Sequence, residues 1–215
     1  MNHRCHCLLV FSALLSITTS ALASNSDEHS DARPFGGQCV WNLPWEALAA
    51  CQEKHPTSSS CLARVMEQHG ASQQALALNQ LLGGEGFMSE FKPMGRVNLA
   101  TILFPTRANT NEVLMLVGGE PPLVSSEIRE TIDISADLAY PALKRRFPDM
   151  ELWTSGASLR SMERLPNGGQ GFIFDYPLLN GCHACDLAGY ALVSLDFGPD
   201  GAYIGPRLIR LEPAK

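Results

Sequence analysis

The chain has 215 residues, of which 16 are Lys or Arg and 22 are Asp or Glu, so its net charge is −6. Hydrophobic residues make up 45% and charged residues 18%, a balance that permits a packed core and differs from that of disordered chains. Nucleic-acid binding requires clustered Lys and Arg, so the negative charge argues against a nucleic-acid partner.

The first 23 residues have the pattern of a cleaved export signal. Arg4 supplies a positive charge, residues 8–17 are mostly apolar, and Ala21–Ala23 offers small residues at a cleavage site. The apolar stretch is about half of the ~20 residues that span a membrane, so it is not expected to stay as an anchor. No second apolar stretch approaches that length, so no integral membrane segment is expected in the mature chain. We therefore predict a periplasmic or secreted protein, cleaved after Ala23.

Residues 24–36 are polar and predict a disordered lead-in to a single domain at 37–215. Residues 41–83 have apolar residues at helical spacing, interrupted by Pro and Gly, and predict a helical N-terminal segment.

From residue 96 the apolar period changes from helical spacing to two, which predicts strands up to residue 212. One helical insertion is expected at 125–147, in two pieces because Pro141 interrupts it. Strands are expected at 97–104, 113–117, 123–124, 150–153, 171–176, 189–197 and 202–211. This order predicts an α+β fold with an antiparallel β-sheet meander, because the helices and strands do not alternate.

Of the seven cysteines, two precede the predicted cleavage site, which leaves five in the mature chain. Cys51 and Cys61 lie near the facing ends of the first two predicted helices, so a disulfide between them is preferred. Pairing of Cys39 with either of them stays open, because sequence alone does not fix connectivity.

Cys182 and Cys185 form a Cys-x-x-Cys motif between two predicted strands. A thioredoxin-like centre needs a helix after the first cysteine, and covalent haem attachment needs His where Asp186 stands. A zinc site would need a second pair of ligands, and the other histidines are scattered. We favour a structural disulfide that pins the connection between the two strands, without metal or cofactor. A redox or metal-binding role is the alternative, and a pair of free thiols is the remaining one.

Residues 37–41, Gly-Gln-Cys-Val-Trp, resemble the start of the nucleophile helix in papain-like and CHAP-type amidases. The resemblance implies Cys39 as a nucleophile, and such a hydrolase also needs a His on a later strand. The candidate is His183, which lies between two cysteines, so we expect Cys39 to be structural or an unpaired thiol.

Arg107, Asn109 and Asn111 form a polar connector between two apolar strands and are a candidate interaction loop. Together these features predict an exported, disulfide-stabilised, non-catalytic envelope protein that binds another protein or a small apolar ligand. The alternative is a thiol-disulfide or metal-binding protein acting through Cys182 and Cys185, and a Cys hydrolase at Cys39 is the third possibility.

Overall fold

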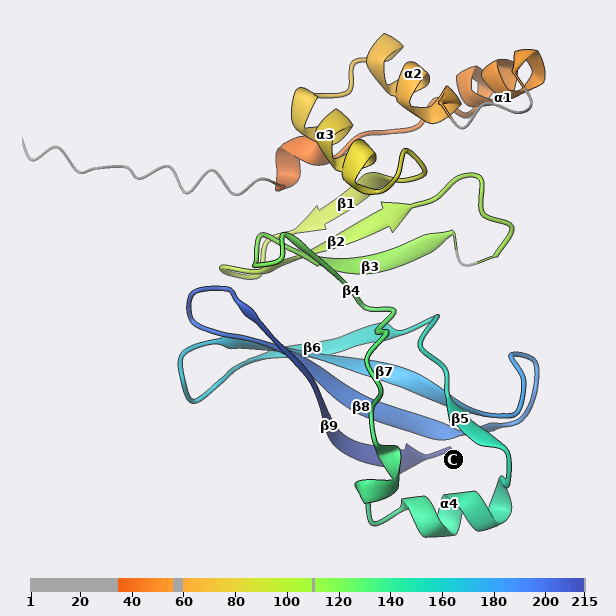
Figure 1. Cartoon of the computed structure of the whole chain (residues 1–215), viewed down its shortest axis with the longest axis vertical. Coiled ribbons are helices and arrows are strands. Elements are labelled where there is room, and N and C mark those ends of the chain that lie inside the picture. Colours follow the sequence, from red (N-terminus) through yellow and green to blue (C-terminus); the bar gives the residue numbers. More distant parts are fainter. Residues whose placement is uncertain (1–34, 56–59, 110, 215) are drawn as a thin grey trace, which may run out of the picture. The chain divides into compact units, whose positions relative to one another are not determined.

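The computed structural model describes residues 35–55, 60–109 and 111–214, so the predicted signal peptide and nearly all of the predicted lead-in lie outside the described residues. This part of the chain forms four α-helices and two antiparallel sheets, a mixed α+β fold (Figure 1). The helices are α1 (Trp45–Lys54), α2 (Cys61–Gln68), α3 (Gln73–Leu81) and α4 (Tyr140–Arg146). The first sheet has the order β1 (Phe87–Lys92), β2 (Asn98–Leu103), β3 (Glu112–Val117), β4 (Leu123–Ser125). The second sheet has the order β5 (Met150–Leu152), β7 (Gln170–Asn180), β8 (Leu187–Phe197), β9 (Tyr203–Pro213), and β6 (Ser158–Arg164) also pairs with β7.

Helices α1 to α3 pack beside β1 (Figure 1). Helix α2 buries Leu62, Val65 and Met66 on one face, as its apolar spacing requires. Ser72 caps α3, since its hydroxyl accepts a hydrogen bond of 3.0 Å from the Ala75 amide. These helices therefore have a core of their own, which includes the buried Phe87 of β1.

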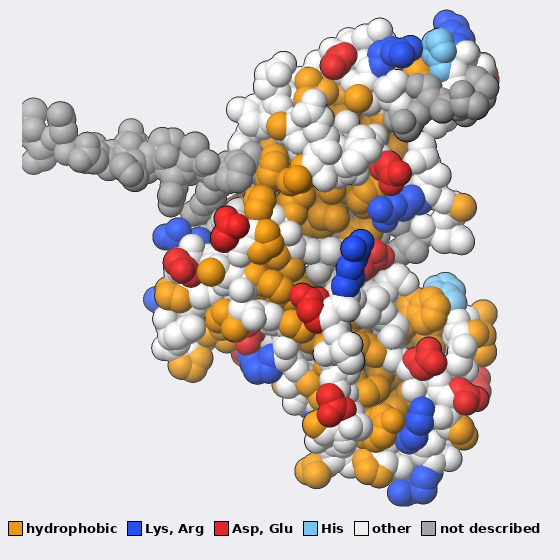
Figure 2. Space-filling model, in the orientation of Figure 1, with side chains coloured by type: hydrophobic (Ala, Val, Ile, Leu, Met, Phe, Trp, Pro, Cys, Tyr) orange, Lys and Arg blue, Asp and Glu red, His pale blue; other side chains and the backbone are white. Residues whose placement is uncertain are grey.

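The largest core lies between the two sheets and joins Leu116 of β3 to Phe172, Phe174 and Phe197 of the second sheet. Figure 2 shows apolar side chains exposed over the middle of the visible face, with charged side chains dispersed around them.

A set of hydrogen bonds from one side chain, the polar clamp, also connects the two sheets. Gln170, the first residue of β7, accepts a hydrogen bond from the Val97 amide and donates to two carbonyls of the segment that leads into β2.

Two expectations about the fold are wrong. The predicted single meander is split into two sheets, and strands β1 and β6 were not predicted. The predicted helical insertion begins only at Tyr140, with Pro141 in its first turn, apart from a short 3-10 turn at Ile134–Ala136. The chain before it is extended because Ile128 and its neighbours pack against the core between the sheets.

A network of ion pairs covers part of the outer face of the second sheet. Arg160 of β6 contacts Asp175 of β7 at 2.8 Å and Glu212 of β9 at 2.9 Å, and Arg210 also pairs with Glu212. Hydrogen bonds from Arg160 and then Arg210 lower the pKa of Glu212 to about 2.

This shift predicts a specific loss of stability in acid. A carboxylate whose pKa is lower in the folded state stabilises the fold above its unfolded pKa, about 4.5, and loses that contribution as the pH falls toward 2. We expect Glu212→Gln to flatten the decline of the thermal midpoint between pH 5 and pH 2, because the amide does not titrate. Equal acid sensitivity in the variant and the parent would contradict this prediction, and Glu151→Gln is the matched control.

Candidate functional site

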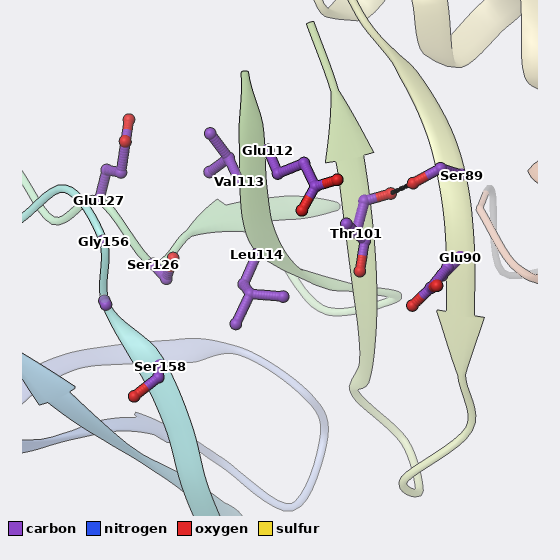
Figure 3. A pocket seen from close by; sticks show the side chains of 11 residues that line it. Ser89, Glu90, Thr101, Glu112, Val113, Leu114, Ser126, Glu127, Gly156 and Ser158 are labelled. Carbon is purple, nitrogen blue, oxygen red and sulfur yellow. Dashed lines mark hydrogen bonds between the residues drawn. The ribbon is translucent and has the colours of Figure 1, made fainter. Parts of the chain in front are cut away.

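A hollow of about 330 Å³ lies between the first sheet and the beginning of β6. Glu90, Thr101 and Leu114 occupy paired positions on β1, β2 and β3, so they share one face of the sheet, and Glu112 lies two residues before Leu114 on that same face. The opposite wall comes from residues 126–127 and 156–158 (Figure 3). The hollow therefore collects side chains from five separate segments of the chain.

Local hydrogen bonds hold both walls in place. A β-bulge interrupts the pairing of β1 at Ser89, whose hydroxyl donates to the Thr101 carbonyl at 3.2 Å. The Ser126 amide donates to the Leu114 carbonyl at 2.9 Å, and the Ser126 carbonyl accepts from the buried Tyr176 hydroxyl at 2.6 Å. Burial raises the pKa of Tyr176 above its usual range, so this hydroxyl stays a donor. The wall that presents Glu127 is thus fixed from inside the core.

Three carboxylates, those of Glu90, Glu112 and Glu127, border the hollow, and no Lys, Arg or His is among its lining residues. None of the three forms an ion pair within the part of the chain that the structure describes. The hydroxyls of Ser89, Thr101, Ser126 and Ser158 provide further acceptors at the same place (Figure 3). Carboxylates and hydroxyls around an opening favour a ligand group that donates hydrogen bonds and has a positive charge.

A larger and more open hollow, about 680 Å³, lies beside the β6–β7 turn and β9. Three of its four charged side chains are already paired, because Arg207 contacts the nearly buried Asp196 at 2.7 Å and Glu163 at 3.4 Å, which leaves Arg164 without an ion pair among the described residues. Asp196 also accepts a hydrogen bond from the buried Ser194 hydroxyl. Arg207 and its partners therefore act as a structural cluster, and the smaller acidic hollow is the better candidate site.

Among the described residues there are two disulfides, Cys51–Cys61 and Cys182–Cys185. The first joins α1 to the start of α2, and the second lies at the tip of the β7–β8 hairpin. Cys39 is a free thiol, fully buried in the core between helix α3 and the first sheet, and burial raises its pKa.

The pairing of Cys39 with His183 that a hydrolase would need is not formed. Cys39 has no exposed surface, whereas His183 lies in the exposed hairpin tip with its ring against Trp153. A buried thiol with a raised pKa is also a poor nucleophile, because the thiolate is the reactive form.

The candidate interaction loop is exposed at Arg107, Asn109 and Asn111. The Arg107 guanidinium lies over the Phe104 ring, 3.4 Å from its centroid, so a cation–π contact orients this side chain at the end of β2. The structure does not bring this loop's residues into the lining of the acidic hollow.

Glu90, Glu112 and Glu127 were missed in the sequence analysis. Glu90 lies in a strand with alternating burial, which the spacing of residues 87–92 could have revealed.

Over residues 35–55, 60–109 and 111–214, no group of three or more His, Cys, Asp or Glu is placed to hold a metal ion, and no helix is long and apolar enough to cross a membrane. Comparisons with protein-family models, with curated proteins and with solved structures give no match to this chain.

Proposed function

We propose that this protein is an exported, disulfide-stabilised binding protein whose acidic hollow receives a cationic group, the ammonium or guanidinium end of a protein side chain or of a small amine. The observation that carries the proposal is the set of three unpaired carboxylates, Glu90, Glu112 and Glu127, around one hollow. The two disulfides support export, because such bonds persist in oxidising compartments.

The polar lining favours a cation over the small apolar ligand that the sequence suggested. A ligand's ammonium group can donate up to three hydrogen bonds, and the hollow offers carboxylate and hydroxyl acceptors from both walls. Leu114 and Ala157 also line the hollow and can contact the aliphatic stem of a lysine-like group. A volume of about 330 Å³ suits one such side chain.

Titration with spermidine and with a blocked lysine peptide, followed by amide NMR shifts, tests this proposal. We expect shifts at residues 90, 112, 114 and 127, and an affinity that falls as salt is added, because exposed charges are screened. The replacements Glu112→Gln and Glu127→Gln should each weaken binding about tenfold, the low end for a hydrogen bond to a charged group.

Two controls make the result specific. Glu151→Gln, an exposed carboxylate on β5 outside the hollow, should leave the affinity unchanged. A neutral isostere, the blocked peptide with norleucine in place of lysine, should not bind. Tight binding of the norleucine peptide would refute a cation site in this hollow. So would unchanged affinities for spermidine and the lysine peptide in both Glu112→Gln and Glu127→Gln.

A further inference from the structure

The Cys182–Cys185 disulfide differs from the Cys51–Cys61 disulfide in its access to solvent. Every residue from 181 to 187 is exposed, including both cysteines of the hairpin tip. Cys61, in contrast, is only 3% exposed and packs in the core of the helical part, and its partner Cys51 is half-buried against the same core. Exchange requires a thiolate to approach a sulfur atom along the S–S axis, so access is the first requirement.

Strands β7 and β8 do not need the Cys182–Cys185 disulfide to stay together. Strands β7 and β8 pair from Gln170 to Leu179 on one side and from Leu187 to Phe197 on the other, a ladder that holds them together without a crosslink. The disulfide lies within the turn itself and joins residues three apart. That turn is already closed by hydrogen bonds from the Cys185 amide to the Cys182 carbonyl, 3.0 Å, and from the Asn180 amide to the Asp186 carbonyl, 3.0 Å.

Further contacts hold the tip in place independently of the disulfide. The Asn180 side-chain oxygen accepts a hydrogen bond of 3.0 Å from the Asp149 amide. The His183 ring lies 5.4 Å from the Trp153 ring, and the Trp153 amide donates to the Pro177 carbonyl at 2.9 Å. The tip can therefore keep its shape when the sulfur atoms are reduced.

We propose that Cys182–Cys185 is a thiol–disulfide exchange site whose substrate is an accessible thiol, independent of the acidic hollow. A substrate thiolate attacks one sulfur, the Cys182–Cys185 bond breaks, and the released cysteine leaves as a thiolate that takes up a proton. A second substrate thiolate then attacks the substrate sulfur of the mixed disulfide, the bond between that sulfur and the protein breaks, and the second protein cysteine also leaves as a thiolate that takes up a proton. The balance is one protein disulfide and two substrate thiols giving one protein dithiol and one substrate disulfide, so the substrate is oxidised and the protein is reduced.

His183 has a positioning role in this step. It follows Cys182 directly in the chain, and a protonated imidazole that comes close to a cysteine sulfur favours the thiolate form over the thiol. The contact of its ring with Trp153 holds the imidazole at the hairpin tip, next to the two cysteines in the chain.

Glutathione is the small-thiol probe, and a reduced, unfolded protein with two cysteines is the protein-thiol probe. The mature chain is incubated with each, quenched by alkylation, digested and quantified by mass. We expect Cys182 and Cys185 to become alkylated about tenfold faster than Cys51 and Cys61, with one substrate disulfide formed per protein. Reaction with only one probe identifies the source of the substrate thiol.

Three variants separate exchange from a structural role. Cys182→Ser/Cys185→Ser should keep the thermal midpoint and the hollow's amide shifts while losing substrate oxidation. His183→Gln should keep the midpoint and slow the exchange several-fold, and Cys51→Ser/Cys61→Ser, where it folds, should still exchange. A pair that is reduced only when the chain unfolds, or a markedly lower midpoint in Cys182→Ser/Cys185→Ser, would overturn the proposal. Neither outcome bears on amine binding, which is measured separately.

Discussion

Replacing Gln170 with Ala is expected to lower the free energy of unfolding by about 3 kcal/mol, near 1 kcal/mol for each hydrogen bond lost. The Gln170 oxygen accepts from the Val97 amide at 2.8 Å, and its nitrogen donates to the Met94 carbonyl at 3.0 Å and the Val97 carbonyl at 3.1 Å. Val97 is fully buried, so its amide and carbonyl gain no water when the side chain is removed. Urea unfolding of the protein measures the change.

Gln170→Glu is the more demanding test of the same geometry. It keeps an oxygen for the Val97 amide and replaces the donor nitrogen by a second acceptor that faces two carbonyls, so it should destabilise at least as much as Ala at neutral pH. Gln80→Ala, an exposed helical Gln, should change stability by less than about 0.5 kcal/mol. A mild effect of Gln170→Glu would mean that the clamp is not formed in solution.

The helix at 125–147 was predicted from apolar spacing and is mostly absent because distant residues determine this segment. The Ser126 amide pairs with β3 and its carbonyl with Tyr176, which lies 50 residues further along the chain. These bonds satisfy the backbone in an extended conformation and bury Ile128 beside the sheet residues. The spacing of apolar residues within 125–147 carries no information about partners so far away in the sequence.

The disulfides show the opposite case, since both depend on short-range geometry. The spacing of Cys51 and Cys61 around a helical turn predicted their pairing, and the structure contains that bond, at a Cα separation of 5.7 Å. The Cys-x-x-Cys motif was equally visible, and the structure has its disulfide in the connection between two strands, where the sequence places it.

The acidic hollow could not be predicted, because its walls depend on strand register. Glu90, Glu112 and Glu127 are solitary acidic residues in sequence, and each alone is typical of a solvated surface. The bulge at Ser89 and the pairing of Glu90 with Thr101 bring the first of these residues to the same face as the second. A shift of one residue in that register would place Glu90 on the other face of the sheet, so that it would no longer line the hollow.

Replacing Gly189 with Ala is expected to destabilise the protein by about 3 kcal/mol or more, at or beyond the upper end for overpacking. A Cβ at Gly189 would lie 2.2 Å from the Glu212 carbonyl oxygen and 3.0 Å from the Pro213 Cα. Both contacts are with backbone, so no rotamer change relieves them, and β9 must move away from β8. That movement also displaces Glu212 from Arg160 and loosens the ion pairs on the outer face of the sheet.

A control variant and a hydrogen-exchange measurement distinguish a local clash at Gly189 from a general loss of stability. Tyr190→Thr, an exposed replacement at the next position of β8 by a residue that favours strands, should stay within about 0.5 kcal/mol of the parent. Amide hydrogen exchange of Gly189→Ala should accelerate first along β9, where pairing with β8 runs from Tyr203 to Pro213, while α2 and α3 keep their protection. Uniform acceleration across the helices and both sheets would show instead that β9 unfolds only with the whole chain, because the core between the sheets, which includes Leu211, depends on that strand.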